Sequence, residues 1–202
     1  ERMRDGRSFA TRRVTAVQDG KAIFTMSASF HIEDHGIEHQ DVMPAVPMPD
    51  ELTDAMDSPD PEYRWVNREW SEWEFRFVPQ DRIVRRDGSA SQQQLWFRSR
   101  LPLPDDPVLH VCTLAYMSDM TLLGSSMVIH RDEDIQGASL DHAMWFMRPF
   151  RADDWLLYSL DSPSAQQSRG LTRGQYFDRQ GRLVASTAQE GLIRVVPGQD
   201  TH

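Results

Sequence analysis

The 202-residue sequence has a single cysteine, Cys112, so no disulfide bond can form within the chain, which fits a reducing compartment. No apolar run approaches the roughly 20 residues that span a membrane, and the N-terminus has no secretory signal pattern. Positive charge is also scarce, because 31 acidic residues outnumber 22 lysines and arginines, for a net charge of −9. This balance argues against nucleic acid or an anionic membrane as the main partner. Together these absences predict a cytoplasmic protein that binds neither.

The first part of the sequence predicts a β-hairpin followed by a linker. Two strand-like runs, Phe9–Val17 and Ala22–Phe30, flank Asp19-Gly20, a dipeptide that favours the positive φ angles of a tight turn. From Glu33 to residue 64, prolines and acidic residues are frequent, which is typical of a linker with at most one short helix at Glu51–Met56. Three histidines lie four residues apart where the hairpin passes into this linker, but the strand-to-linker context disfavours the rigid helix that a metal site would need. They are His31, His35 and His39.

The segment Asp106–Leu123 predicts a helix that is apolar on nearly every side. Asp106 suits the N-cap position, and Pro107 suits the first helical position. A helix without a polar face is normally buried, so we expect the rest of the fold to wrap this one. Its one formal charge after Val108 is Asp119, and a buried carboxylate must be hydrogen-bonded, paired or neutral. Asp119 is therefore either a structural residue or a catalytic one.

Apolar periodicity predicts further strands around this helix. They are Glu74–Val78, Gln92–Leu101, Ala138–Met147, Trp155–Leu160, Leu171–Phe177 and Arg182–Val195. In the last of these strands, Gln189 falls on the apolar face, so its amide needs hydrogen-bond partners inside the core. A regular strand would place Ser139 on one face and His142 on the opposite face.

The sequence also contains an internal repeat. A shift of 161 positions aligns Thr11-Arg12 with Thr172-Arg173, and Gly20-Lys21 with Gly181-Arg182. Self-similarity at a fixed distance predicts two copies of one unit. The second copy has a strand, the long helix and four more strands, whereas this sequence holds only the last two strands of the first copy.

Several stretches resemble the acyl-CoA thioesterase II family. They are "DGRSFATRRVTAVQDGKAIFTMSASF", "GIEHQ", "YMSDMTLL", "SLDHAMWFMRPF", "WLLYSLDSPSAQQSRGL" and "ASTAQEG", in the order that the family has them. The resemblance implies an α+β double hotdog, an antiparallel sheet wrapped around a long buried helix, with the first hotdog incomplete. Residues 1–32 would be the C-terminal hairpin of the first hotdog, 33–64 the linker and 65–202 the second, complete hotdog. We interpret the sequence as lacking the family's usual N-terminal part.

The resemblance implies that the protein hydrolyses fatty acyl-CoA to a free fatty acid and CoA. By position in these motifs, the catalytic Asp, the Thr or Ser, and the Gln of the family fall on Asp119, Ser139 and Gln189. Asp119 would accept a proton from a water molecule that all three side chains hold, and this water would attack the thioester directly. We expect no cofactor and no metal ion. The expected partners are acyl-CoA as substrate and further copies of the chain, because hotdog proteins commonly associate.

Three alternatives stay open. A covalent mechanism with Ser139 as nucleophile needs a base such as His142, which a regular strand turns to the opposite face. A hotdog enoyl-CoA hydratase needs a histidine a few residues after its aspartate, and the first one after Asp119 is His130. The third alternative is a non-catalytic module for acyl-CoA binding or assembly.

Overall fold

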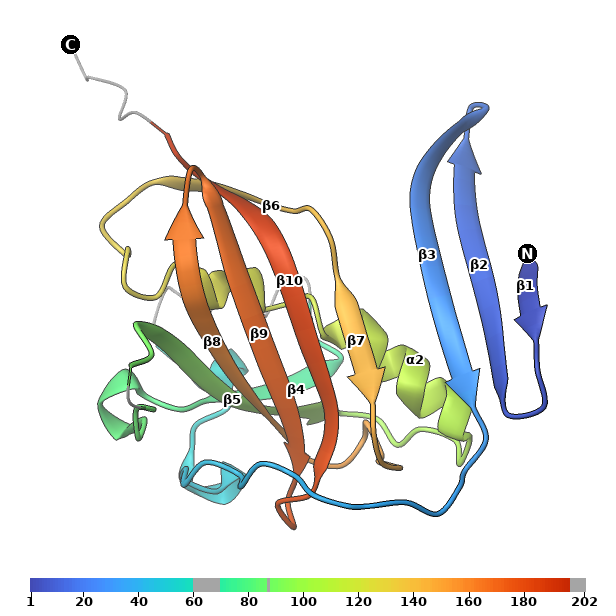
Figure 1. Ribbon diagram of the computed structural model, residues 1–202. Helices are drawn as coiled ribbons and strands as arrows, with labels where there is room; N and C mark the ends of the chain where they lie inside the picture. The colour runs from blue at the N-terminus through green and yellow to red at the C-terminus, as the bar shows by residue number, and fades with distance from the viewer. Residues whose placement is uncertain (60–69, 87, 197–202) are drawn as a thin grey trace. The chain divides into compact units, whose positions relative to one another are not determined.

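The computed structural model describes residues 1–59, 70–86 and 88–196, which belong to two compact units, Glu1–His39 and Gln40–His202. The first unit is a three-stranded antiparallel sheet of β1 (Arg2–Asp5), β2 (Phe9–Gln18) and β3 (Lys21–His31), in that order (Figure 1). Asp19 and Gly20, between β2 and β3, have φ angles of 50° and 74°. The predicted hairpin and its turn are therefore confirmed.

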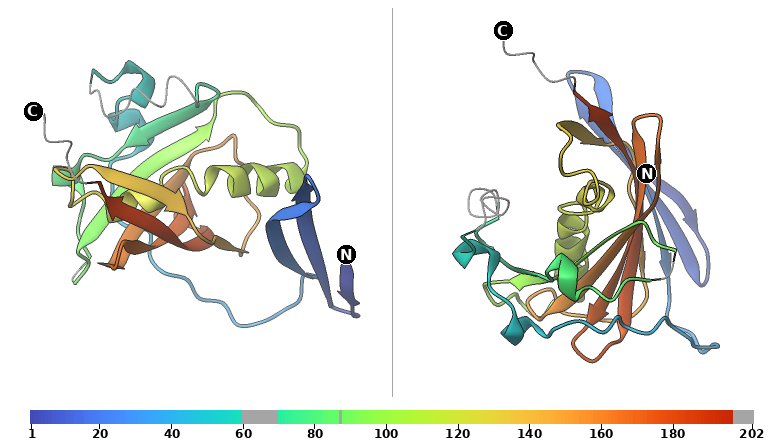
Figure 2. Two further views of the ribbon diagram at one scale, coloured as in Figure 1. Left: turned by 90° about the horizontal axis from the view of Figure 1, so that it is seen from above. Right: turned by 90° about the vertical axis from the view of Figure 1, so that its left-hand side faces the viewer.

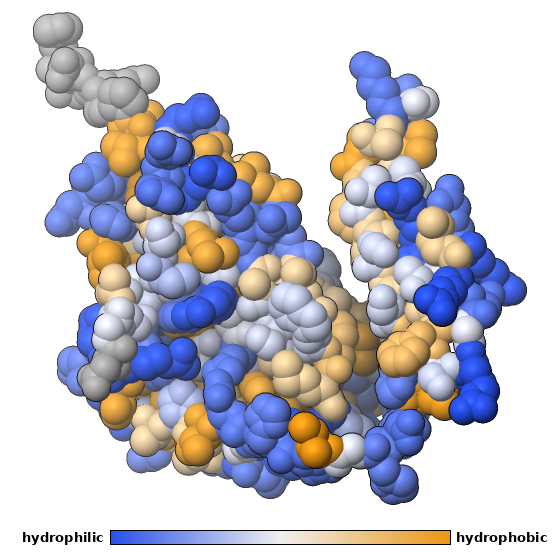
Figure 3. Space-filling model, in the orientation of Figure 1, coloured by the Kyte–Doolittle hydropathy of each residue, from blue (hydrophilic) through white to orange (hydrophobic). Residues whose placement is uncertain are grey.

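Large apolar side chains of the first unit are exposed. Phe9, Ile23 and Phe24 are 59%, 62% and 53% exposed, and the Phe9 ring stacks on His31. Figure 3 shows apolar and polar residues interspersed on the visible face of this unit. The described elements of the first unit are thus three strands, and several of their large apolar side chains are exposed.

In its described residues, the second unit is a curved antiparallel sheet with one α-helix. Its strands are β4 (Trp73–Phe77), β5 (Ser91–Ser99), β6 (Ile135–Ser139), β7 (Ala143–Phe146), β8 (Leu156–Gln166), β9 (Arg169–Asp178) and β10 (Leu183–Val195). They are ordered β4-β5-β8-β9-β10-β6, and β7 also pairs with β10. The sheet curves around α2 (Pro107–Met117), as both views of Figure 2 show. Among the described residues, no helix is long and apolar enough to cross a membrane.

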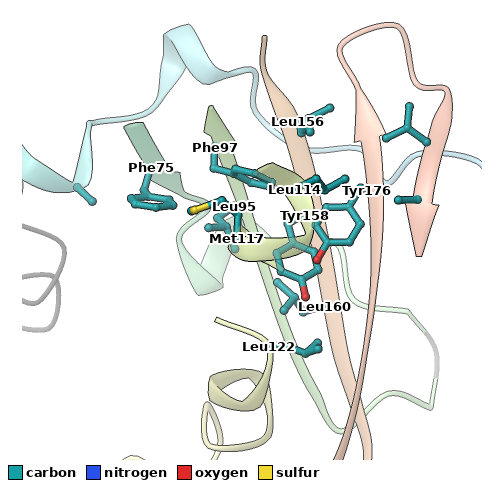
Figure 4. Packing of buried hydrophobic residues seen from close by; sticks show 13 residues of the cluster. Phe75, Leu95, Phe97, Leu114, Met117, Leu122, Leu156, Tyr158, Leu160 and Tyr176 are labelled. Carbon is teal, nitrogen blue, oxygen red and sulfur yellow. The ribbon is translucent and has the colours of Figure 1, made fainter. Parts of the chain in front are cut away.

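The core of the second unit lies between α2 and the concave face of the sheet. Leu114 and Met117 of α2 pack against Phe97, Tyr158 and Tyr176, which come from three strands (Figure 4). Each of these side chains is at most 1% exposed. Because burying one large apolar side chain stabilises a fold by about 1.5–3 kcal/mol, this cluster holds α2 on the sheet.

The prediction of a helix buried on every side over Asp106–Leu123 is wrong in two respects. The helix ends at Met117, and turns and a short 3-10 helix follow it. One face of α2 is also open, since Val108 and Tyr116 are 68% and 65% exposed. The predicted cap is confirmed, because Asp106 accepts a hydrogen bond from the backbone N–H of Val108 at 2.9 Å.

Part of the segment predicted as a linker packs on the second unit. The side-chain amide of Gln40 donates to Gly181 O at 2.8 Å and accepts from the backbone N–H of Leu183 at 3.1 Å. Trp96 Nε1 donates to Pro47 O at 2.9 Å. The described part of the chain contains the short 3-10 helices η1 (Pro49–Glu51), η2 (Ala55–Asp57), η4 (Gln80–Arg82) and η5 (Leu123–Ser126). The predicted boundary at residues 64 and 65 lies outside the described residues, so the domain limits stay a prediction.

Gly174 in β9 allows the ring of Tyr158 to lie close to the sheet. A Cβ atom at Gly174 would lie 2.2 Å from Tyr158 Cε2, and stacking on Tyr176 leaves that ring little room to move. We therefore expect Gly174→Ala to lower the free energy of unfolding by about 1–3 kcal/mol. Urea denaturation measures the loss, with Gly124→Ala as control, since a Cβ there meets nothing within 4 Å. Equal stability of the two variants would contradict this packing.

Candidate active site

The structure brings Asp119, Ser139 and Gln189 together in the second unit. Ser139 Oγ donates to the carboxylate of Asp119, whose two oxygens lie 3.1 and 3.4 Å away. Gln189 Nε2 donates to Ser139 Oγ at 2.8 Å. A continuous chain of hydrogen bonds thus joins a turn after α2, the end of β6 and the middle of β10.

The turn that carries Asp119 is fixed by a buried tyrosine. Ser118, the C-cap of α2, accepts a hydrogen bond on its carbonyl oxygen from Tyr158 Oη at 2.8 Å. Burial raises the pKa of Tyr158 well above its ordinary value, and the negative charge of Asp119 adds to this rise. The phenol therefore stays protonated and keeps donating to the residue that precedes Asp119.

Gln189 is buried as the sequence predicts. It is only 1% exposed, and in β10 it lies two residues before Gly191, the partner of Ser139 across the β6–β10 ladder. Its backbone carbonyl accepts from Thr172 Oγ1 at 3.2 Å, and its side-chain amide finds polar partners on the concave side of the sheet. The requirement that a buried amide be hydrogen-bonded is thus met at this position.

The prediction that Asp119 is buried is wrong. Its side chain is 54% exposed, and Ser139 is exposed as well. The physical reason is the early end of α2, which places Asp119 in a turn instead of on the buried face of a helix. This exposure leaves the carboxylate of Asp119 open to water.

The segment Ala138–Met147, predicted as one regular strand, forms two strands with a bulge between them. β6 pairs Ser139 with Gly191 of β10. β7 pairs Ala143 with Ala188 of the same strand. Residues 140–142 therefore lie opposite residues 189–190, three against two, which is the geometry of a β-bulge.

The bulge turns His142 toward the site. The backbone N–H groups of Leu140 and Asp141 both donate to Glu190 O, at 3.1 and 3.3 Å. The Asp141 side chain closes the gap in the ladder by accepting from the backbone N–H of Glu190 at 2.7 Å. One extra residue in a strand reverses the face of every side chain that follows it. The prediction that His142 faces away from Ser139 is therefore wrong.

His142 contacts Gln189 instead of Ser139. Its Nδ1 atom lies 2.6 Å from Gln189 Oε1, and its Nε2 atom lies 2.7 Å from Ser118 Oγ. Its Nδ1 atom also lies 3.9 Å from a carboxylate oxygen of Asp119. Because the hydroxyl of Ser139 donates to Asp119, the geometry provides no serine–histidine pair for covalent catalysis. In the sequence, a role for His142 was indicated by its position next to Asp141 in a largely apolar stretch.

A cavity of about 580 Å³, with apolar, polar and charged side chains in its lining, borders the turn that carries Asp119. Met120 and Thr121, which follow Asp119, line it together with Phe77, Met127 and Ile135 at the start of β6. This volume lies within the range of about 300–1,000 Å³ that is common for small-molecule sites. A second cavity of about 370 Å³ is lined by Asp161 and Arg173 among others, and none of the three predicted residues lines either cavity.

The described residues form no cluster with the composition of a metal site. Nowhere in this part of the chain do three or more His, Cys, Asp or Glu side chains lie together as metal ligands. This includes the spaced histidines at 31, 35 and 39.

Comparison with known proteins gives matches over nearly the whole chain. The sequence model of a family described as acyl-CoA thioesterase matches residues 67–192, and one described as acyl-CoA thioesterase N-terminal domain matches residues 1–31. Acyl-coenzyme A thioesterase 8 of Mus musculus is 39% identical over 98% of this chain and 67% of the mouse protein.

Solved structures that match this chain also include an acyl-CoA thioesterase. The crystal structure of acyl-CoA thioesterase II TesB2 from Mycobacterium marinum is 56% identical, with a TM-score of 0.89 over 98% of this chain and 73% of that one. A protein of unknown function with a hot dog fold from Alicyclobacillus acidocaldarius is 19% identical, with a TM-score of 0.76 over 98% and 72% of the two chains. The predicted hotdog-type α+β fold is thus confirmed.

Proposed function

This chain belongs to the acyl-CoA thioesterase family of thioester hydrolases, and we propose that it cleaves fatty acyl-CoA through a water molecule held by Asp119, Ser139 and Gln189. The observation that carries the proposal is the hydrogen-bond chain from Gln189 through Ser139 to Asp119. A carboxylate, a hydroxyl and an amide joined by hydrogen bonds are the groups that a hydrolytic water needs for activation and orientation.

In the proposed reaction, the exposed carboxylate of Asp119 accepts a proton from the water as its oxygen attacks the thioester carbon. The new C–O bond gives a tetrahedral oxyanion, which collapses with cleavage of the C–S bond. The CoA thiolate leaves and takes up the proton from Asp119, so the site returns to its starting state. The Nε2 atom of Gln189 carries two hydrogens and donates one of them to Ser139. In this mechanism, the second hydrogen is donated to the water or to the oxyanion.

We place the acyl chain of the substrate in the cavity of about 580 Å³ beside Asp119. Its apolar lining residues Phe77, Met120 and Met127 suit a hydrocarbon chain, and flexible Met side chains adapt to ligands of different shape. The lining also contains charged side chains, Arg131 and Glu133 among them. The cavity starts at the residue after Asp119, so a chain bound there would present its thioester near the carboxylate. The cytoplasmic location and the homo-oligomer expected from the sequence stay predictions.

Release of free thiol from palmitoyl-CoA by the purified chain tests the proposed function. We expect thiol release, no hydration of an enoyl-CoA, and no acylated protein in intact mass spectra recorded during turnover. Binding of palmitoyl-CoA without thiol release would favour the non-catalytic module, and hydration without thiol release would favour the hydratase. A chain that gains the mass of one acyl group on Ser139 would show a covalent mechanism instead.

Removing the hydroxyl of Ser139 is expected to slow turnover. Ser139→Ala deprives both Asp119 and Gln189 of a partner, and we expect kcat for palmitoyl-CoA to fall about 10–100-fold. Ser139→Thr is the matched control, because it keeps the hydroxyl and should keep most of the activity. Equal turnover by the two variants, measured by thiol release, would contradict a role for the hydroxyl.

A further inference from the structure

His142 contacts Gln189 more closely than it approaches the carboxylate of Asp119, since its Nδ1 atom lies 2.6 Å from Gln189 Oε1 and 3.9 Å from the nearer carboxylate oxygen. The chain of hydrogen bonds does not stop at Gln189, because its Oε1 atom lies 2.6 Å from His142 Nδ1. The His142 side chain is 27% exposed, and the bulge between β6 and β7 aims it at this amide. Among the three residues of the proposed site, Gln189 is therefore the one that His142 contacts within hydrogen-bond distance.

The carboxylate of Asp119 sets the direction of every bond in this chain. An ionised carboxylate only accepts hydrogen bonds, so the single hydroxyl hydrogen of Ser139 is donated to Asp119. Ser139 Oγ must then accept from Gln189, which requires that Nε2 of the amide faces Ser139. The Oε1 atom of Gln189 consequently faces His142 and also accepts. His142 Nδ1 must therefore carry a hydrogen.

The far edge of the His142 ring is anchored in either protonation state. Its Nε2 atom lies 2.7 Å from Ser118 Oγ and 3.4 Å from Thr187 Oγ1. A neutral ring accepts from one of these hydroxyls, and a protonated ring donates to them while they donate to the carbonyls of Ala115 and Ala143. Nδ1 carries its hydrogen in both cases, so its bond to Gln189 does not depend on the charge of the ring.

We propose that His142 is a positioning residue that holds the Gln189 amide with Nε2 toward Ser139. The inference rests on the proposed function and adds the residue that orients the Gln189 amide. The two ends of a Gln amide have nearly the same shape, so packing alone does not select one orientation. A reversed amide presents Oε1 to Ser139, competes with Asp119 for the hydroxyl hydrogen, and withdraws the Nε2 donor from the water.

A pair of uncharged variants of equal shape tests the proposal. In His142→Asn the side-chain nitrogen takes the place of Nδ1 and still donates to Gln189, whereas His142→Leu has no donor. We expect kcat for palmitoyl-CoA to fall about 100-fold in His142→Leu, as for other losses of geometry at a reacting centre, and to recover mostly in His142→Asn. KM should stay within about twofold of the wild type in both, because neither change alters a group proposed to contact the substrate.

A double-mutant cycle separates positioning from general structural damage. If His142 acts only through Gln189, then His142→Leu should cause no further loss of kcat in a Gln189→Met background. Ser118→Ala removes a partner from the far edge of the ring, and it should keep most of the activity. The proposal is overturned if His142→Leu keeps wild-type kcat, if His142→Asn loses as much as His142→Leu, or if the loss persists in the Gln189→Met background.

Nitrogen NMR of the wild-type chain provides a readout that is independent of activity. We expect the Nδ1 atom of His142 to be protonated, and an unprotonated Nδ1 overturns the proposal whether or not the chain turns over. If no thiol is released by the wild type, the proposed function fails by itself. If the wild type is active and Asp119→Asn is inactive while His142→Leu is unaffected, only the role of His142 fails.

Discussion

Replacing Asp119 with Asn is expected to lower kcat for palmitoyl-CoA about 10²–10⁴-fold, the range for loss of a general base. An amide cannot take a proton from water, although it still accepts the hydrogen bond of Ser139. The fold should be unaffected, because the Asp119 side chain is 54% exposed and Asn has nearly the same size. Thiol release measures the activity, and thermal denaturation measures the stability of the same sample.

Asp141→Asn is the matched control for this variant. Asp141 is a nearby exposed carboxylate whose oxygen accepts from the backbone N–H of Glu190, and an Asn oxygen at this position still accepts. The control should turn over at close to the wild-type rate. A similar rate from Asp119→Asn would refute the assignment of Asp119 as the base.

Replacing Gln189 with Met is expected to lower kcat about 10²–10³-fold, as does loss of a single preorganised donor at an oxyanion. Met fills nearly the same buried volume but offers no N–H to Ser139 or to the reacting groups. The change also leaves His142 Nδ1 without its acceptor, so we expect a loss of about 1–3 kcal/mol in the free energy of unfolding.

Gln94→Met separates this effect from the general cost of losing a buried amide. Gln94 is 2% exposed in β5, where its side-chain nitrogen lies 3.5 Å from Ser159 Oγ. We expect a change in stability at this position with kcat within about twofold of the wild type. If the two Met variants lose activity to the same degree, Gln189 has no special part in turnover.

The strands and the core position of Gln189 were predictable because they depend on periodicity along the chain. Alternation over Arg182–Val195 assigns Gln189 to the apolar face, and β10 keeps that alternation through its middle part. The hairpin at Asp19-Gly20 was predictable for a similar reason, since the turn dipeptide acts locally. Both features are set by residues close together in the sequence, so the structure agrees with the prediction.

The end of α2 was not predictable, because a distant residue takes part in fixing it. Apolar residues recur after Met117, at Met120 and Leu122–Leu123, but the carbonyl of Ser118 accepts a hydrogen bond from Tyr158, which lies 40 positions later. The bulge before His142 is likewise a property of two paired strands, visible only when the β6–β10 and β7–β10 registers are known. These two features account for both errors at the site, the burial of Asp119 and the side on which His142 lies.

The most direct test of the account is a crystal structure of the chain with a ketone analogue of palmitoyl-CoA, in which a methylene group replaces the thioester sulfur. We predict one ordered water within hydrogen-bond distance of the Asp119 carboxylate and of Ser139 Oγ or Gln189 Nε2, facing the ketone carbon. The account is contradicted if Ser139 Oγ itself lies against that carbon with no water between them, or if the ketone lies away from Asp119.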